Sequence, residues 1–360
     1  MAGVPQKSLL AGLLQALEGP APLVILPHDN PDPDALASAA ALKFLVRELI
    51  GKDAVIALGG IVGRAENRAM LTYLNIDLQP IGTLALDGPV HVALVDTQPG
   101  RTNNSLPAGM TPTVVIDHHP AYDDYQGVPF LDLREDYGAT STILTEYVRE
   151  SHLEIESKIA TALFYGIMAE TQDLGRESTP ADIAAAQFLY PYANKRRLGK
   201  IENARVPREY FAAFHEAIER AQIYGRVVVS VLPEVQYPDM VAEVADFLLR
   251  LDEVEWACAI GRYQDYLHVS LRTTEREVNA GDVDDRLEGQ RARARLQCPA
   301  EREDPRPRHF LKRLRTASPL DRSGNALEQQ QPPGDQVAVP GVDDHLHVLL
   351  QEIAIHKAQV

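Results

Sequence analysis

Histidine and aspartate residues gather at three places in the first third of the chain, each just after a short apolar run. The apolar runs are Leu23–Leu26, His91–Val95 and residues 114–116. The residues that follow these runs are His28, Asp32, Asp34, Asp96, Asp117, His118 and His119. Carboxylates and imidazoles are side chains that bind divalent metal ions without sulfur. The three clusters therefore predict a metal centre.

The number of acidic groups indicates how many ions such a centre needs. Carboxylates brought close together repel one another and raise their own pKa values unless cations lie between them. A set of oxygen and imidazole ligands suits Mn(II), with Mg(II) and Co(II) as alternatives. Two such ions, about 3.5 to 4 Å apart, clamp a phosphoryl group and lower the pKa of a water molecule. The predicted chemistry is hydrolysis of a phosphoester or a phosphoanhydride.

A purely structural role is the alternative for each residue taken singly. Asp34, for example, has the residue type and position of an N-cap for a helix that begins at Ala35. Turns have no need, however, to collect histidine and aspartate after three separate strands. We therefore favour the metal centre for the three clusters taken together.

Apolar runs alternate with helical patterns over the first half of the chain, which predicts an α/β fold. We expect a mostly parallel sheet with helices on both faces. The expected strands are Leu23–Leu26, Ala54–Leu58, His91–Val95 and 113–116, and the expected helices are 34–50, 139–148, 156–169 and 180–192. Because ligands bind at the carboxyl ends of strands in such sheets, the three clusters should meet in one crevice.

The chain is predicted to contain two domains and a tail. Residues 1–190 form the expected catalytic domain, 191–206 a polar and basic linker, and 207–290 a second, smaller α/β domain across a cleft. Residues 286–316 then carry nine Arg and one Lys against four acids, and residues 317–342 are rich in Pro, Gly, Gln and Ser. We therefore expect residues 291–360 to be a divergent or partly disordered tail.

Composition narrows the range of partners. The net charge is −16, so broad attraction to the phosphates of nucleic acid is not expected, and a phosphate-bearing substrate needs a local cationic centre. Cys258 and Cys298 are too few for a disulfide framework, which favours a reducing, cytoplasmic location. No membrane segment is expected, and no protein partner is implied; a homodimer stays open.

Taken together, these motifs resemble the DHH phosphoesterase superfamily. The triplet Asp117-His118-His119 matches the one that names the superfamily, residues 28–34 match its His-x-x-x-Asp-x-Asp motif, and Asp96 matches its strand-terminal Asp. The motifs occur in the right order, and the likeness covers roughly residues 20–290. The resemblance implies a DHH domain followed by a DHH-associated C-terminal domain.

The resemblance also implies how two metal ions are held. His28, Asp32 and Asp96 would hold one ion. Asp34, Asp96 and His118 would hold the other, so that Asp96 bridges the pair.

Four further residues take roles from the resemblance. His119 would contact the scissile phosphate and protonate the leaving oxygen, which an imidazole can do near pH 7. Asp117 would orient the histidines. The superfamily's Gly-Ile-x-x-Asp-Thr motif stands here as residues 166–171, with Glu170 in place of Asp. We predict Glu170 as the last metal ligand, and Asp173 is the rival if the helix continues.

The second domain is expected to bind the nucleotide or phosphate end of the substrate. Arg272 and Asn279 match its strand and the turn that follows, and Arg272 suits bidentate phosphate binding. The alternative for Arg272 is a solvated surface charge. The superfamily's Gly-rich, His-containing loop does not follow; Arg291, Arg293 and Arg295 stand there instead.

The function predicted is that of a cytosolic, Mn-dependent phosphoesterase of the branch that degrades very short RNA and removes the 3′-phosphate of adenosine 3′,5′-bisphosphate. A phosphodiesterase for cyclic or linear dinucleotides is an alternative, since the same centre serves these substrates. A nucleotide-binding sensor without turnover is another. An inorganic pyrophosphatase is less favoured, because the chain has no basic Ser-Arg-Lys-Lys motif.

Overall fold

The computed structural model describes residues 8–123, 125–175, 178–264 and 266–274. The chain divides into two compact units, the first ending at Val206 and the second beginning at Pro207. Asn279, the arginines at 291, 293 and 295, and the predicted tail lie outside the described residues. No helix of the described part is both long enough and apolar enough to cross a membrane.

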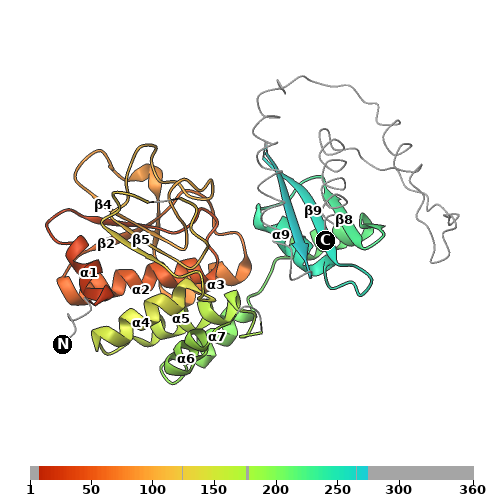
Figure 1. Ribbon diagram of the computed structural model, residues 1–360. Coiled ribbons are helices and arrows are strands. Elements are labelled where there is room, and N and C mark those ends of the chain that lie inside the picture. The colour runs from red at the N-terminus through yellow and green to blue at the C-terminus, as the bar shows by residue number, and fades with distance from the viewer. Residues whose placement is uncertain (1–7, 124, 176–177, 265, 275–360) are drawn as a thin grey trace, which may run out of the picture. The chain divides into compact units, whose positions relative to one another are not determined.

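The first unit is built on a six-stranded sheet in the order β3-β2-β1-β4-β5-β6 (Figure 1). Every neighbouring pair in this sheet is parallel, which confirms the predicted α/β class. The strands are β1 (Leu23–Leu26), β2 (Ala54–Leu58), β3 (Leu78–Pro80), β4 (His91–Val95), β5 (Val114–Asp117) and β6 (Phe130–Leu133). Strands β1, β4 and β5 are neighbours, so their carboxyl ends lie at the same edge of the sheet.

The helices of the first unit gather on one face of the sheet, as Figure 1 shows for α2, α4 and α5. The helices are α1 (Leu9–Ala16), α2 (Pro33–Ile50), α3 (Ala65–Leu74), α4 (Thr140–Ser151), α5 (Ser157–Glu170), α6 (Pro180–Leu189) and α7 (Lys195–Glu202). Helix α2 is rich in buried alanines and packs against α4, α5 and the sheet. Small side chains let these layers approach closely around one apolar core.

The other face of the sheet differs from the expectation of helices on both sides. Its apolar side chains, among them Leu26, Leu94 and Val115, pack against loop residues such as Leu84 and Met110. The connections from β3 to β4 and from β4 to β5 form no α-helix, and the 3₁₀ turn Ile81–Thr83 is their regular element. These segments are short and rich in Pro and Gly, which favours loops over helices.

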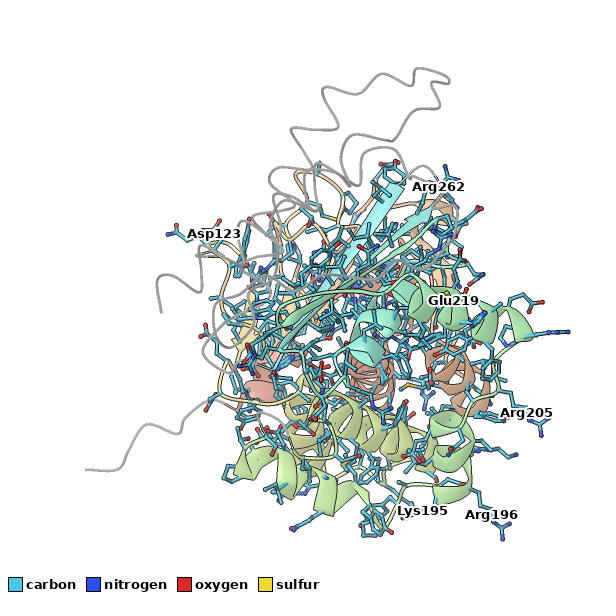
Figure 2. The ribbon with its side chains drawn as sticks, turned by 90° about the vertical axis from the view of Figure 1, so that its right-hand side faces the viewer. Asp123, Lys195, Arg196, Arg205, Glu219 and Arg262 are labelled. Atoms are coloured by element: carbon cyan, nitrogen blue, oxygen red, sulfur yellow. The ribbon has the colours of Figure 1, made fainter. Side chains whose placement is uncertain are left out.

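The segment predicted as a linker contains helix α7. Asn194 caps this helix by accepting hydrogen bonds from the backbone N–H groups of Arg196 and Arg197, both at 3.1 Å. Its apolar side chains, Leu198 and Ile201, are buried in the core of the first unit. Figure 2 shows Arg196 extending away from the body of the unit, whereas the ammonium of Lys195 donates to the backbone carbonyls of Tyr190 and Ala193. The basic composition of this segment therefore belongs to the exposed side of a packed helix.

The second unit has a smaller, mixed sheet in the order β10-β9-β8-β7. Strands β8 and β9 are parallel, whereas the other two pairs are antiparallel. The elements are α8 (Arg208–Glu219), β7 (Gln222–Tyr224), β8 (Val227–Leu232), α9 (Asp239–Leu248), β9 (Trp256–Tyr263) and β10 (Tyr266–Thr273). Helices α8 and α9 bury their apolar faces against this sheet and form a separate core.

Candidate metal centre

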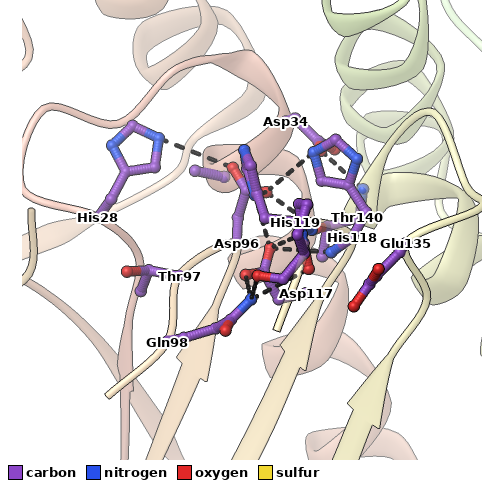
Figure 3. A network of polar contacts seen from close by, with 12 residues as sticks. His28, Asp34, Asp96, Thr97, Gln98, Asp117, His118, His119, Glu135 and Thr140 are labelled. Carbon is purple, nitrogen blue, oxygen red and sulfur yellow. Dashed lines mark hydrogen bonds and ion pairs between the residues drawn. The ribbon is translucent and has the colours of Figure 1, made fainter. Parts of the chain in front are cut away.

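Three loops meet at the carboxyl ends of β1, β4 and β5, and they carry the three predicted clusters (Figure 3). Asp32 is the N-cap of α2, because its Oδ1 accepts the backbone N–H of Ala35 at 2.9 Å. Asp34, for which an N-cap role was the structural alternative, lies inside the first turn instead. The other oxygen of Asp32 lies 3.7 Å from Nε2 of His28.

Asp96 lies at the middle of the centre and is 2% exposed. Its Oδ2 lies 3.7 Å from Nε2 of His28, and its Oδ1 lies 3.7 Å from Nε2 of His118. Thr140 donates a hydrogen bond of 2.9 Å to Oδ1 and fixes the carboxylate. The backbone of Asp96 is left-handed, with φ of 59°, a conformation that Asp tolerates better than most residues. Each oxygen of Asp96 thus faces a different imidazole.

Two groups of potential ligand atoms share Asp96. The first ligand group consists of His28, Asp32 and Asp96, and the second consists of Asp96, His118 and His119. Within each group the ligand atoms lie within 4.8 Å of one another. Asp96 is the residue that the two ligand groups have in common, and its predicted role as a bridge stays a prediction.

The ring of His118 has only one nitrogen engaged by the protein. Nδ1 lies 3.0 Å from the carbonyl oxygen of Tyr137, which can only accept, so Nδ1 carries the proton. Nε2 is buried and has no hydrogen-bond partner among the residues that the structure describes. A buried polar atom without a partner is costly. A metal ion beside Asp96 would supply that partner, so the donor set fits a bound ion.

Asp117 holds His119 rather than joining either ligand group. Its Oδ1 accepts hydrogen bonds of 2.8 Å from Nδ1 of His119 and from the backbone N–H of His118, and its Oδ2 accepts Nε2 of Gln98 at 2.7 Å. Burial alone would raise the pKa of Asp117, but the hydrogen bond and charge of His119 lower it. Asp117 is therefore an ionised acceptor that orients both histidines.

The pKa of His119 is raised to about 10. Burial by itself would lower the pKa of this imidazole, but the hydrogen bond to Asp117 and the charges of Asp96 and Asp117 outweigh burial. Because Nδ1 is engaged by Asp117, the nitrogen left for a substrate is Nε2. This arrangement suits a proton donor better than a metal ligand.

The buried acids at the core of the centre repel one another, and the imidazoles beside them offset this repulsion only in part. The pKa of Asp34 is raised well above its ordinary value, first by burial and then by the charges of Asp96, Asp32 and Glu170. Burial and the charge of Asp32 likewise raise the pKa of Asp96. Hydrogen bonding and charge from Asp32 raise the pKa of His28 to about 9, against the lowering effect of burial. Divalent cations would relieve this excess of negative charge.

Asp34 is fully buried but belongs to neither ligand group. Its Oδ2 accepts the backbone N–H of Thr140, and its Oδ1 accepts that of Ser141, both at 2.7 Å. These bonds tie the start of α4 to the start of α2. Each oxygen keeps a second lone pair, so the predicted role of Asp34 as a ligand stays a prediction.

Glu170 is the last residue of α5 and is half-buried. Its charge acts on both Asp34 and His119, but it lies outside the two ligand groups. Because α5 ends at Glu170, Asp173 does not lie one turn further along the helix. Asp173 is exposed, in a turn where residues 172–174 have positive φ. The condition under which Asp173 rivalled Glu170 is therefore not met.

Arg272 lies on β10 of the second unit, where its guanidinium is already engaged. Nε donates to Oδ1 of Asp246 at 2.6 Å, and Nη1 donates to the backbone carbonyl of Leu271 at 3.0 Å. A phosphate would have to compete with Asp246 for this side chain. The predicted substrate role of Arg272 stays a prediction.

Sequence reasoning missed the residues that hold the predicted ligands in place. Gln98 is fully buried, and its side chain donates to Asp117. Thr140 donates to Asp96 through its hydroxyl and to Asp34 through its backbone N–H. The backbone carbonyl of Tyr137 contacts the ring of His118. A polar pair, Thr97 and Gln98, directly after the ligand at the end of β4 is a signal that could have been used for Gln98. A backbone carbonyl leaves no trace in residue types.

The fold and the centre together define an α/β domain with potential metal ligands at the carboxyl ends of its strands. Residues 22–167 match the DHH family, N-terminal domain. An uncharacterized protein of Methanocaldococcus jannaschii is 37% identical over 268 residues, which is 74% of this chain and 55% of that protein.

Two further likenesses concern a second sequence relative and the fold. A probable manganese-dependent inorganic pyrophosphatase of Enterococcus faecalis is 29% identical over 168 residues, covering 46% of this chain and 54% of the relative. The crystal structure of an exopolyphosphatase-related protein from Bacteroides fragilis shares the fold, with a TM-score of 0.62 at 14% identity over 76% of this chain and 86% of that one. The chain spans about half the length of the curated relatives it matches.

Proposed function

We propose that this chain is a two-metal phosphoesterase that uses Mn(II) to hydrolyse short oligoribonucleotides, adenosine 3′,5′-bisphosphate or both. The observation that carries the proposal is the buried, unpartnered Nε2 of His118, which faces Asp96 across from His28. An oxygen and nitrogen donor set fits Mn(II). The match of residues 22–167 to the DHH family, N-terminal domain, and the similarity to relatives named as manganese-dependent support the same conclusion.

The residues divide into those that hold ions and those that act on the substrate. His28 and Asp32 hold one ion with Asp96, and His118 holds the other with Asp96. Asp34 and Glu170 complete the second site in this proposal. When bound, the ions neutralise phosphate charge and lower the pKa of a water molecule.

His119 supplies the proton for the leaving oxygen. Its Nδ1 hydrogen bond to Asp117 fixes the ring and favours the protonated imidazole. Removing a positioned general acid slows a reaction by about 10² to 10⁴. Gln98 and Thr140 keep the acceptors Asp117 and Asp96 from turning.

A short substrate suits the charge of the chain. With a net charge of −16, the protein has no broad electrostatic attraction for a long polyanion. The centre itself gathers five acidic side chains, counting Asp117 and Glu170, so attraction for phosphate must come mainly from the bound ions. We therefore favour substrates with one to a few phosphates over long single strands.

A pyrophosphatase is the second candidate, because relatives from two bacteria are named as probable manganese-dependent inorganic pyrophosphatases. The test incubates the full chain and Mn(II) with pyrophosphate, adenosine 3′,5′-bisphosphate, a linear dinucleotide and a five-nucleotide RNA. The rate of product release is measured for each substrate. Fastest release from the RNA or the bisphosphate supports the proposal, and fastest release from pyrophosphate supports the second candidate.

Two variants control the substrate panel. Asp96→Asn keeps a side chain that tolerates positive φ and should lower the rate by at least about 10³, because ions contribute several kcal/mol to transition-state stabilisation. Asp87→Asn removes a charge from an exposed loop residue and should leave the rate unchanged. Tight nucleotide binding without turnover in the unaltered chain would contradict the enzyme and indicate a sensor.

A further inference from the structure

Tyr122 is an exposed aromatic residue that the protein holds in a fixed position. It follows His119 by three residues, and 54% of it is exposed. Its backbone N–H donates to Oε1 of Gln98 at 2.9 Å, and the guanidinium of Arg101 lies 4.5 Å from the centre of its ring. A Cβ atom at Gly100 would lie 3.2 Å from the ring, so a glycine there lets the ring pack closely on the loop.

Gln98 connects Tyr122 to the proton donor of the centre. This side chain is fully buried, and its amide group makes contacts at both ends. Nε2 donates to Oδ2 of Asp117 at 2.7 Å, while Oε1 accepts the backbone N–H of Tyr122 and the hydroxyl of Tyr125. Figure 3 shows Gln98 beside Asp117 at the base of this network. The position of Tyr122 is thus tied to the acid that orients His119.

The loop that carries Tyr122 is also held from its other side. The backbone N–H of Ala121 donates to Oε1 of Glu135 at 2.9 Å, and Nη2 of Arg101 donates to the carbonyl of Pro120 at 3.4 Å. Contacts on both sides lower the conformational entropy that binding would otherwise cost. An aromatic ring that is fixed yet more than half exposed is a preorganised binding surface.

We propose that Tyr122 and Arg101 form a nucleoside subsite beside His119, in which Tyr122 stacks on a base of the substrate and Arg101 attracts the adjoining phosphate. Aromatic side chains bind bases by stacking with little preference among them. A substrate made of phosphates alone would gain nothing from the ring. This inference rests on the proposed function and narrows the substrate to phosphoesters of a nucleoside.

The test compares a linear dinucleotide with an analogue in which each nucleoside is replaced by ribose, so that the scissile phosphodiester is the same. The ratio of kcat/KM for the two substrates is measured with Mn(II) for the full chain and its variants. The unaltered protein should prefer the dinucleotide by about tenfold, from the usual strength of base stacking. Tyr122→Ala should lose most of this preference through a higher KM, and Tyr122→Phe should keep it.

Tyr190→Ala is the matched control, because Tyr190 is 53% exposed and follows the C-terminal end of α6. This variant should keep the preference. Equal preference in Tyr122→Ala and in the unaltered chain would overturn the subsite.

A binding measurement separates this inference from the proposed function. Affinities for adenosine 5′-monophosphate and for ribose 5-phosphate are measured by calorimetry with the same proteins. If the protein hydrolyses neither the dinucleotide nor its ribose analogue, the proposed function fails. A smaller preference for adenosine 5′-monophosphate over ribose 5-phosphate in Tyr122→Ala than in the unaltered chain would still support the subsite. An unchanged preference in that variant overturns it.

Discussion

The imidazole of His118 is oriented by the backbone of Tyr137, whose carbonyl oxygen lies 3.0 Å from Nδ1. This contact turns Nε2 toward Asp96, where it is buried without a hydrogen-bond partner in the described part of the chain. Tyr137 is itself anchored, because its hydroxyl donates to Glu146 at 2.8 Å and its N–H donates to the carbonyl of Arg134 at 3.0 Å. The side chain of His118, a proposed metal ligand, is therefore oriented by a residue that is not itself a proposed ligand.

Replacing His118 tests whether its free nitrogen binds an ion. We expect His118→Gln to weaken Mn(II) binding at one of two sites by at least about tenfold, the lower range reported for changes around a metal ligand. Calorimetric titration of the metal-free protein gives the affinity and the stoichiometry. His91→Gln is the control. His91 is the first residue of β4, whereas Asp96 follows the last residue of that strand, so His91 lies at the other end of β4 from the metal centre. Equal Mn(II) binding by both variants would refute the role of His118.

His119 should matter for turnover rather than for metal binding. We expect His119→Gln to lower kcat by about 10² to 10⁴, the usual contribution of a general acid, with the number of bound ions unchanged. Steady-state kinetics and metal titration of the same sample check this prediction. A variant that loses one ion would show instead that His119 is a ligand.

The ion pair between Asp132 and Arg134 should stabilise the fold more than an exposed pair does. Asp132 is buried and accepts hydrogen bonds from Nε and Nη2 of Arg134, and also from the hydroxyl of Tyr147. Removing one partner of a buried pair costs about 3 to 5 kcal/mol. Arg134 keeps Glu146 as a second partner when Asp132 is removed, but the buried hydroxyl of Tyr147 loses its acceptor. Asp132→Ala should therefore lower the free energy of unfolding by about that amount.

The exposed pair of Arg47 and Glu156 is the matched control for this measurement. Glu156→Ala should cost less than about 1 kcal/mol, the usual value of a surface ion pair. Urea unfolding of both variants gives the two costs. Similar losses for the buried and the exposed pair would be inconsistent with a structural role for Asp132.

Gly60 is required because the loop after β2 packs against the loop after β1. A Cβ atom at Gly60 would lie 2.0 Å from the backbone oxygen of Asp29, which is next to His28. Gly60→Ala must shift that backbone, so we expect a loss of about 1 to 3 kcal/mol, as for overpacking, together with weaker Mn(II) binding. Gly82→Ala meets no atom within 4 Å and should change neither. Unfolding and metal titration check both variants.

Much of the fold could be predicted from the sequence because strands buried on both faces form continuous apolar runs. β1, β2 and β4 have the bounds that their runs predict. β6 was not predicted, since its four residues include Asp132, and the Arg134 and Tyr147 contacts that make this burial possible come from tertiary structure. β3 was missed because it is short and mostly exposed.

The residues that meet at the site could be predicted from the sequence, but their individual roles could not. The convergence of His28, Asp96 and His118 follows from strand ends that share one edge of a parallel sheet. The division of roles between Asp32 and Asp34 does not follow, because both aspartates lie near the start of the same helix and only the backbone decides which one caps it. The end of α5 at Glu170 was equally hidden, as no Gly or Pro follows until Gly175.

The most direct test of the paired-ion centre is a crystal structure of the protein with Mn(II), using anomalous scattering at the manganese absorption edge. The account predicts two anomalous peaks, one on either side of the Asp96 carboxylate, with His28 next to one and His118 next to the other. The two peaks should lie about 3.5 to 4 Å apart, as in other two-metal sites. Absence of a peak beside Asp96, or manganese bound only elsewhere on the chain, would contradict the account.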